Sequence, residues 1–400
     1  MRKRVFLFLV FAACSAVAGG QVKTAELKPD VPFVFNLTKD SSREFQLDLK
    51  KGDYAEFGWK NQLDGFWVET AMLSPNGKDI LYGDGLIIPA SGVYKYRVSL
   101  KGDAEAASDK VQKLTLTYKN VLKIPADTVV GETRKINGYD VKIIVPKNKE
   151  EGGESFVLVE RAGKPEAMLK GDAFGVSGFN FANSSVEGGG ESNSLFAKTT
   201  DITGDGTPDI GIEYFSGGAH CCFDFYVFEL GKEVKQIPPV SGRDNPISAG
   251  SVNPKGGLFL ETGDSTFAYW NVPFAGSPLL AVTLEFRGDS FHASPARMKR
   301  PAPAMAELQK QAAEAKSKLN NVAYKGDSFA GITEDDGYVF EDAFWGTMLD
   351  LIYTGNNDLA WKYFDMVWPA TKPGKEIFKK DFRTRLENSP YWEDIKPANW

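Results

Sequence analysis

The hydrophobic pattern of this 400-residue chain changes its period once. Up to about residue 298, apolar and polar residues alternate in short runs between turn residues, as in Phe45–Leu49 and Val282–Phe286. This two-residue period is typical of strands with one buried face. After Lys299–Pro303 the apolar residues recur at spacings of three and four, as in Met305 and Leu308, which is the helical period. The switch predicts a mainly β protein with a C-terminal α-helical segment.

Residues 21–122 form the first predicted domain. Four alternating runs lie in it: Phe45–Leu49, Tyr54–Trp59, Phe66–Leu73 and Val93–Leu100. Three phrases between the runs are rich in turn residues: Lys51–Tyr54, Ser74–Lys78 and Ala90–Tyr94. These phrases resemble those of bacterial pre-peptidase C-terminal (PPC) domains, jelly-roll β-sandwiches that are appended to secreted enzymes. The resemblance implies a β-sandwich that serves as an accessory or binding module, with its aromatic residues in the core.

Residues 125–298 contain three hairpins of similar design, which predict a degenerate internal repeat. Their first strands are Phe156–Val159, Phe225–Phe228 and Val282–Phe286, and each is followed by a turn with glycine. The starts lie 69 and 57 residues apart, near the size of propeller blades. Closed propellers have four to eight blades, so three units favour an open or sandwiched arrangement of blade-like antiparallel sheets.

Residues 301–400 form the predicted helical region. Four segments show the helical spacing of apolar residues: Met305–Leu319, Phe340–Ile352, Leu359–Trp368 and Lys375–Leu386. Pro369 and Pro373 separate the last two. The apolar run of the leader described below is too short to span a bilayer, and no later segment holds the ~20 apolar residues that a membrane-spanning helix requires.

The stretch from Asp201 to Asp209 sets oxygen-bearing side chains at alternate positions around a glycine. The candidate ligands are Asp201, Thr203, Asp205, the carbonyl of Thr207, and Asp209, at relative positions 1, 3, 5, 7 and 9. Oxygen donors at this spacing, with Gly206 at position 6, are typical of calcium loops. An EF-hand is excluded because position 12 is Ile212 instead of a glutamate and the flanks are not helical.

The flanks of this stretch predict that it joins two strands. A short mixed run, Leu195–Thr199, precedes it, and an alternating run, Ile210–Phe215, follows. A DxTGDGxxD loop followed by such a strand is similar to the calcium hairpin of FG-GAP and VCBS repeats, which implies a structural calcium ion here. The alternative is an Asp/Gly turn in which the carboxylates accept backbone N–H groups and hold no metal.

A second unusual phrase, Ser216 to Cys222, follows the loop and resembles a pattern in uncharacterised exported bacterial proteins. Cys221 and Cys222 are adjacent, and the only other cysteine is Cys14. In an oxidising compartment they are predicted to form a vicinal disulfide, with free thiols or a cross-link between chains as alternatives. His220 could join them as a metal ligand, but three adjacent residues do not easily converge on one ion.

The N-terminus predicts export. Arg2–Arg4 is basic, Val5–Ala13 is apolar, and Ala16–Gly20 offers small residues for cleavage, so residues 1–20 are predicted to be a signal peptide. A lipid anchor at Cys14 is the alternative. Removing residues 1–20 leaves 44 basic and 53 acidic side chains, a net charge of −9, and no basic patch that would favour nucleic acid. The expected location is periplasmic or secreted.

No catalytic residue is assigned from the sequence. The chain has two histidines and no nucleophile-elbow motif. Ser216 lies four residues before His220, but in a glycine-rich turn, where flexibility and not activation is the usual reason for a serine, and His292 is expected to have a surface role. The sequence therefore favours a calcium-binding protein that binds or scaffolds an unknown protein or glycan in the cell envelope. The alternative is an envelope hydrolase that uses Asp and Glu carboxylates in a cleft between the β domains.

Overall fold

The computed structural model places the chain in two compact units. The first comprises Met1–Leu81 with Ala90–Leu122, and the second comprises Tyr82–Pro89 with Lys123–Trp400. The structure describes residues 25–60, 66–80, 85–102, 110–182, 195–196, 200–218, 222–319, 323–324, 326, 329–330 and 343–396. The predicted signal peptide, Cys14, His220 and Cys221 lie outside these residues.

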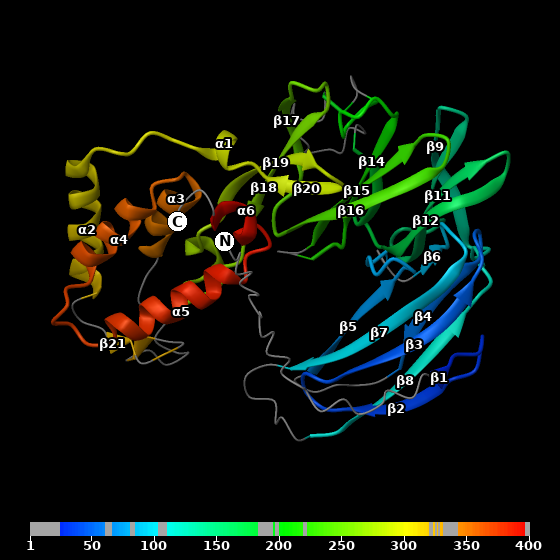
Figure 1. The fold of residues 1–400 in the computed structure, drawn as a ribbon, viewed down its shortest axis with the longest axis horizontal. Coiled ribbons are helices and arrows are strands. Elements are labelled where there is room, and N and C mark those ends of the chain that lie inside the picture. The colour runs from blue at the N-terminus through cyan, green and yellow to red at the C-terminus, as the bar shows by residue number, and fades with distance from the viewer. Residues whose placement is uncertain are drawn as a thin grey trace, which may run out of the picture. The chain divides into compact units, whose positions relative to one another are not determined.

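The first unit is a sandwich of two β-sheets (Figure 1). One sheet has the order β1 (Ala25–Glu26), β3 (Ser42–Leu49), β7 (Gly92–Gly102) and β5 (Phe66–Leu73). The other contains β2 (Phe33–Leu37), β8 (Gln112–Lys119) and β4 (Tyr54–Trp59). All neighbours in this unit pair antiparallel except β1 with β3, which pair parallel. The four strands predicted for this domain are confirmed as β3, β4, β5 and β7.

The core of the first unit is formed by every second side chain of its strands. Along β7, Tyr94, Tyr96, Val98 and Leu100 are buried while the residues between them are more exposed. The ring of Tyr96 stacks on that of Phe57 of β4, with centroids 3.7 Å apart, so the two sheets meet through aromatic side chains. The aromatic residues of this domain are thus largely core residues, as the sequence predicts.

The second unit contains three four-stranded antiparallel sheets, each built from four consecutive strands. The first sheet is β9 (Thr128–Ile136), β10 (Tyr139–Pro146), β11 (Gly153–Arg161) and β12 (Lys164–Ala173). The second is β13 (Gly178–Phe181), β14 (Asp209–Phe215), β15 (Phe223–Leu230) and β16 (Val234–Arg243). The third is β17 (Ser248–Val252), β18 (Leu258–Asp264), β19 (Leu280–Arg287) and β20 (Ser290–Ala293). Strand β6 (Gly85–Ile87) belongs to this unit and lies against β12.

The three predicted hairpins are confirmed, and they occupy the same place in each sheet. They are the third and fourth strands: β11 with β12, β15 with β16, and β19 with β20. In the first, Arg161 pairs with Lys164 across Ala162 and Gly163, whose φ values of 51° and 75° suit a tight hairpin turn. The repeat is therefore a four-stranded meander, of which the sequence pattern detected only the second half.

The middle sheet is covered on both faces. Ile210, Ile212 and Phe228 lie in a core shared with the first sheet. Phe225 and Val227 point to the opposite face, into a core shared with the third sheet and the helices. Strand alternation thus places the middle sheet between two apolar layers.

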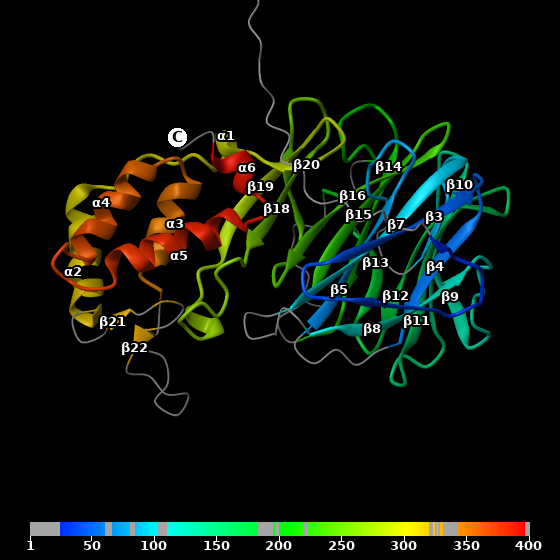
Figure 2. The same cartoon turned by 60° about the horizontal axis from the view of Figure 1, so that its bottom comes forward.

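The C-terminal helices pack into that second core (Figures 1 and 2). They are α1 (Pro295–Met298), α2 (Met305–Leu319), α3 (Trp345–Tyr353), α4 (Asn357–Val367), α5 (Lys375–Glu387) and α6 (Trp392–Ile395), with two short strands, β21 (Ala323–Tyr324) and β22 (Phe329–Ala330), between α2 and α3. These confirm the predicted helical region, although residues 340–342 lie outside the described ones. Among described residues, no helix is long and apolar enough to cross a membrane.

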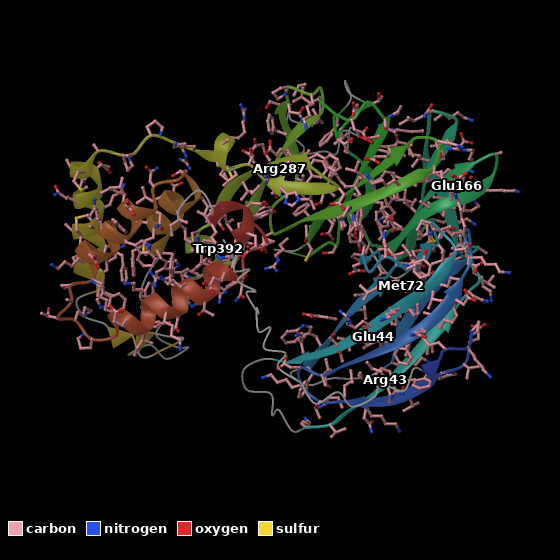
Figure 3. All side chains as sticks on the ribbon, in the orientation of Figure 1. Arg43, Glu44, Met72, Glu166, Arg287 and Trp392 are labelled. Carbon is pink, nitrogen blue, oxygen red and sulfur yellow. The ribbon has the colours of Figure 1, made fainter. Side chains whose placement is uncertain are left out.

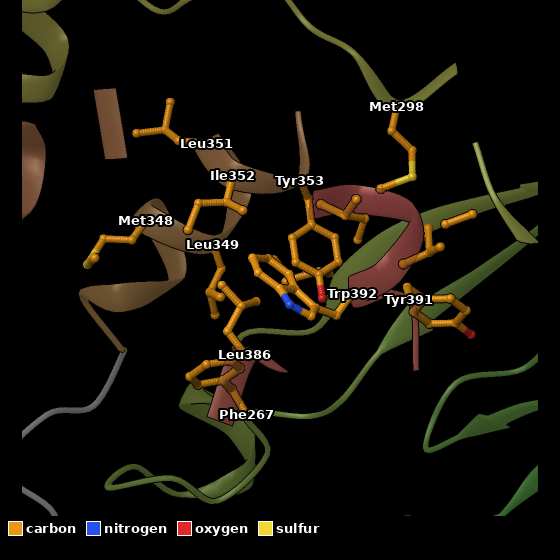
Figure 4. Packing of buried hydrophobic residues seen from close by; sticks show 14 of the residues in the cluster. Phe267, Met298, Met348, Leu349, Leu351, Ile352, Tyr353, Leu386, Tyr391 and Trp392 are labelled. Atoms are coloured by element: carbon orange, nitrogen blue, oxygen red, sulfur yellow. The ribbon is translucent and has the colours of Figure 1, made fainter. Parts of the chain in front are cut away.

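The connection between β18 and β19 joins the third sheet to the helices. Phe267 and Trp270 of this connection are buried, and the Trp270 ring lies 5.0 Å from that of Trp345 on α3. Figure 4 shows Phe267 beside Leu386 of α5. The helices therefore share one hydrophobic core with the third sheet and one face of the middle sheet.

Candidate metal centre

The Asp201–Asp209 loop lies on the connection between two paired strands of the middle sheet, β13 and β14. The expectation of a strand at Leu195–Thr199 is wrong for the residues described there. Leu195 and Phe196 form a turn, and residues 197–199 lie outside the described part of the chain. The Phe196 ring is buried 5.2 Å from that of Phe225, so this residue fills the core instead of extending the sheet.

Asp201 closes the first half of the loop by accepting backbone N–H groups. Its Oδ1 accepts from Gly204 at 2.6 Å and from Asp205 at 3.2 Å, and its Oδ2 accepts from Gly206 at 2.9 Å. Gly204 and Gly206 have φ values of 78° and 89°, which other residues adopt only with strain. The two glycines therefore allow the backbone to fold around one carboxylate.

Asp209 is the buried carboxylate of the loop. Only 2% of it is exposed, and its Oδ2 accepts the Thr203 N–H at 2.8 Å and the Thr203 hydroxyl at 3.0 Å. Its Oδ1 is fully buried and has no hydrogen-bond partner among the described residues. Burial raises the pKa of Asp209 to about 7; the bonds from Thr203 oppose this, and the negative charges of Glu229 and Asp201 add to it.

The two remaining predicted ligands lie at the exposed tip. The Asp205 side chain accepts the Thr207 N–H at 2.7 Å, which is a local turn contact. Hydrogen bonds of Thr203 link Asp201 and Asp209, whereas no described hydrogen bond links Asp205 to Asp209. Among described residues, no group of three or more Asp, Glu, His or Cys side chains has the arrangement of a metal site. The carboxylates are arranged here as in the Asp/Gly-turn alternative.

The base of the loop is fixed by the neighbouring sheet. The Leu258 N–H of β18 donates to the Ile202 carbonyl at 2.9 Å, and Ile202 is buried. A Cβ on Gly257 would lie 2.6 Å from the Gly204 nitrogen, so the two backbones touch. At the other end, the Leu230 N–H donates to the Pro208 carbonyl at 2.7 Å. The loop therefore has a rigid base and an exposed tip.

The donor set fits a hard cation. All candidate ligands offer oxygen, which is the ligand type that calcium prefers. The unpartnered Asp209 Oδ1 is a buried acceptor that lacks a donor or cation, a condition that costs free energy in a folded protein. The residues present thus fit calcium chemically, through an acceptor that the protein itself leaves unsatisfied.

Ser216 and Cys222 are hydrogen-bonded to each other between β14 and β15. The Cys222 N–H donates to the Ser216 hydroxyl at 2.6 Å, and the Ser216 N–H donates to the Cys222 carbonyl at 3.0 Å. Cys222 is disulfide-bonded, but the other cysteines of the chain lie outside the described residues. The vicinal pairing with Cys221 therefore stays a prediction, as does any role of His220.

The first unit has a pocket of about 330 Å³ that the sequence did not indicate. Its lining mixes apolar, amide, carboxylate and phenol groups: Leu27, Pro29, Gln46, Leu47, Asp48, Leu49, Asp53, Tyr118 and Asn120. These residues come from three separate segments of the chain. Their proximity depends on strand pairing, so no local motif could have predicted it.

Comparison with known proteins adds little. No family model matches the chain, and no curated protein matches it. Among solved structures, a periplasmic lysozyme inhibitor of g-type lysozyme from Salmonella Typhimurium, PliG, is similar at 19% identity and a TM-score of 0.20, over 24% of this chain and 97% of that one. A PliG mutant from Escherichia coli is similar at 20% identity and a TM-score of 0.18, over 22% and 85%. Likenesses this weak carry no argument about function.

Proposed function

We propose that this protein is an exported calcium-binding protein that binds a protein or glycan in the cell envelope, with its three-sheet unit as the scaffold. The observation that carries the calcium proposal is the buried, unpartnered Oδ1 of Asp209 beside Asp201. A cation would satisfy this acceptor and offset the repulsion between the two carboxylates. The loop base is already held by the third sheet, so calcium would stiffen the loop without opening it.

The calcium proposal is tested by thermal unfolding with and without calcium, after the protein has been freed of divalent ions with a chelator. A ligand that binds only the folded state at 100 times its Kd stabilises it by about 2.7 kcal/mol, so the melting temperature should rise. Asp205→Ala should abolish the rise. Without calcium the variant should change little, because Asp205 is exposed and accepts only one described bond.

Asp53→Ala is the matched control. Asp53 lies in the first unit and also accepts a backbone N–H in a turn, from Lys50 at 2.7 Å. This variant loses the same kind of contact without touching the loop, so it should keep the calcium response. A melting temperature that does not respond to millimolar calcium would reject the proposal.

The pocket of the first unit supports glycan as the partner. Amide, carboxylate and phenol groups, as in Gln46, Asp48 and Tyr118, are types that hydrogen-bond sugar hydroxyls. A glycan array with the purified protein tests this directly. Binding should weaken in Gln46→Ala and Asn120→Ala, whose side chains are exposed at the pocket. Glycan binding that is unchanged in both variants would exclude this pocket as the binding site.

A further inference from the structure

A serine, a histidine and an aspartate form a hydrogen-bonded chain at the end of the third sheet. The Ser290 hydroxyl lies 3.0 Å from Nε2 of His292. Nδ1 of the same ring lies 3.2 Å from Oδ1 of Asp394. A nucleophile, a base and an orienting group are thus connected in the order that acyl-transfer enzymes use. Such a triad is recognised by its geometry and not by the positions of its residues in the chain.

Local structure places the three side chains together. Ser290 and His292 are two residues apart on β20, so strand alternation puts both on one face. Asp394 comes from α6, which buried Trp392 and Ile395 hold against the core. Figure 4 shows Trp392 packed beside Tyr353 of α3, and Figure 3 shows Arg287 and Trp392 in the same part of the unit.

Asp394 is itself held by two donors. Its Oδ2 accepts the Ala293 N–H at 3.0 Å, and its Oδ1 accepts from the Arg287 guanidinium at 3.0 Å. Because an ionised carboxylate only accepts hydrogen bonds, the neutral His292 ring must carry its proton on Nδ1. Nε2 is then the acceptor that faces the Ser290 hydroxyl, which is the tautomer a general base requires.

The site is open to solvent at the edge of its sheet. The His292 side chain is 39% exposed and that of Asp394 is 19% exposed, and β20 is the last strand of its sheet. The Ser294 N–H donates to Thr283 of β19. Ladder alternation therefore turns the Phe291 N–H outward, like the Ala293 N–H that reaches Asp394. An outward N–H next to the nucleophile can donate to a developing oxyanion.

We propose that Ser290 is the nucleophile of a hydrolytic site for short acyl esters, with His292 as the base and Asp394 as the positioning residue. The Ser290 oxygen would attack the ester carbonyl carbon while its proton passes to Nε2 of His292. The ester C–O bond then breaks, and the alcohol leaves with that proton. Water attacks the acyl-serine carbonyl carbon while one of its protons passes to Nε2. The bond between the acyl carbon and Oγ then breaks, Oγ takes the proton back from Nε2, and the acid leaves. One ester and one water give one acid and one alcohol.

The exposure of the site decides which esters can reach it. The half-exposed imidazole at a strand edge is reached directly from solvent, so an ester that projects from a larger molecule can approach it. This site differs from the hydrolase alternative drawn from the sequence, which relied on paired carboxylates. It also does not depend on calcium. The sequence did not predict it because 102 residues separate His292 from Asp394.

The proposal is tested with p-nitrophenyl acetate and a fluorophosphonate probe, on the full protein in the presence of a chelator. We expect ester turnover and a covalent adduct that peptide mapping places on Ser290. Ser290→Ala should lose the adduct and lower kcat/KM at least about 100-fold, while His292 remains present. Asp394→Asn should lower kcat with little change in KM, because it alters the ring's proton position and not substrate binding.

Ser251→Ala is the matched control, because Ser251 lies on β17 of the same sheet and its hydroxyl faces Arg297 at 3.5 Å, not an imidazole. It should behave as the unchanged protein. If the unchanged protein gives no adduct on Ser290, or if Ser290→Ala hydrolyses the ester as fast as Ser251→Ala, the proposal is overturned. The contacts would then serve only to tie α6 to β20.

Discussion

Two aspartates of the second unit are almost equally buried but differ in their hydrogen bonds. Asp264, at the end of β18, is 4% exposed; Thr266 donates twice to its Oδ1, and Tyr353 and Ser389 each donate to its Oδ2 at 2.5 Å. Asp209, at the start of β14, is 2% exposed, and only its Oδ2 is bonded. One carboxylate has donors on both oxygens from the protein, and the other has donors on one.

This difference separates a structural carboxylate from a ligand. The two donors to Oδ2 of Asp264 come from Tyr353 of α3 and from Ser389, two residues after the end of α5, so this aspartate connects the third sheet to the helices. Burial and the negative charge of Asp264 together raise the pKa of Tyr353 well above its ordinary value, so its hydroxyl stays a donor. Asp209 lacks such a connection on one oxygen, which is why we propose a cation for it.

The largest effect is expected from Asp264→Ala. The substitution removes the buried carboxylate that accepts from the Tyr353 and Ser389 hydroxyls, which keep the 3.1 Å bond between them, and breaking such a network costs about 3–5 kcal/mol. Urea unfolding followed by tryptophan fluorescence measures this loss, which should be the same with and without calcium.

Tyr353→Phe is the milder companion to that substitution. It removes one hydroxyl that donates to Asp264, and a hydrogen bond to a charged group contributes about 1.5–3 kcal/mol. A loss below about 1 kcal/mol in Asp264→Ala would contradict the structural role, since surface substitutions have effects of that size.

Asp209→Asn, in contrast to Asp264→Ala, should change the stability in calcium but not the stability without it. The amide has nearly the same shape and can still accept from Thr203, so the free energy of unfolding without calcium should change by less than about 1 kcal/mol. The calcium-dependent gain, about 2.7 kcal/mol at 100 times the Kd, should disappear. Thermal unfolding in chelator and in calcium measures both quantities. If Asp209→Asn were as destabilising without calcium as Asp264→Ala, the contrast between the two aspartates would be wrong.

Local features of the chain were predictable from sequence. The strands Tyr54–Trp59 and Phe66–Leu73 and the helix Met305–Leu319 have the predicted bounds, because hydrophobic alternation and helical spacing act over a few residues. The acidic loop was found because its candidate ligands lie within nine consecutive positions. The prediction of a strand was wrong at Leu195 and Phe196 because these two residues pack into a core that only tertiary packing defines.

Contacts between distant segments were not predictable. Asp264 lies 89 residues from Tyr353 and 125 from Ser389, and His292 lies 102 from Asp394. No periodicity or spacing rule connects such positions in a single sequence. The candidate metal loop is local, so the sequence indicated it; the serine–histidine–aspartate site is assembled by packing α6 against β20, so only the structure could.

Glu213 extends the comparison to a carboxylate affected by burial alone. It lies on β14, and burial raises its pKa from 4.5 to about 7. The folded state therefore resists ionisation, and stability falls as the pH rises from about 4.5 to 7. Glu213→Gln removes this cost, so it should equal the unchanged protein at pH 4 and exceed it at pH 8 by about 1–2 kcal/mol, a value reduced for partial exposure. Urea unfolding at both pH values measures the difference, with exposed Glu69→Gln as the control that should show none.

An equal effect of Glu213→Gln at pH 4 and pH 8 would show that its burial does not control its ionisation. Glu213 would then differ from Asp209, whose ionisation is disfavoured by burial.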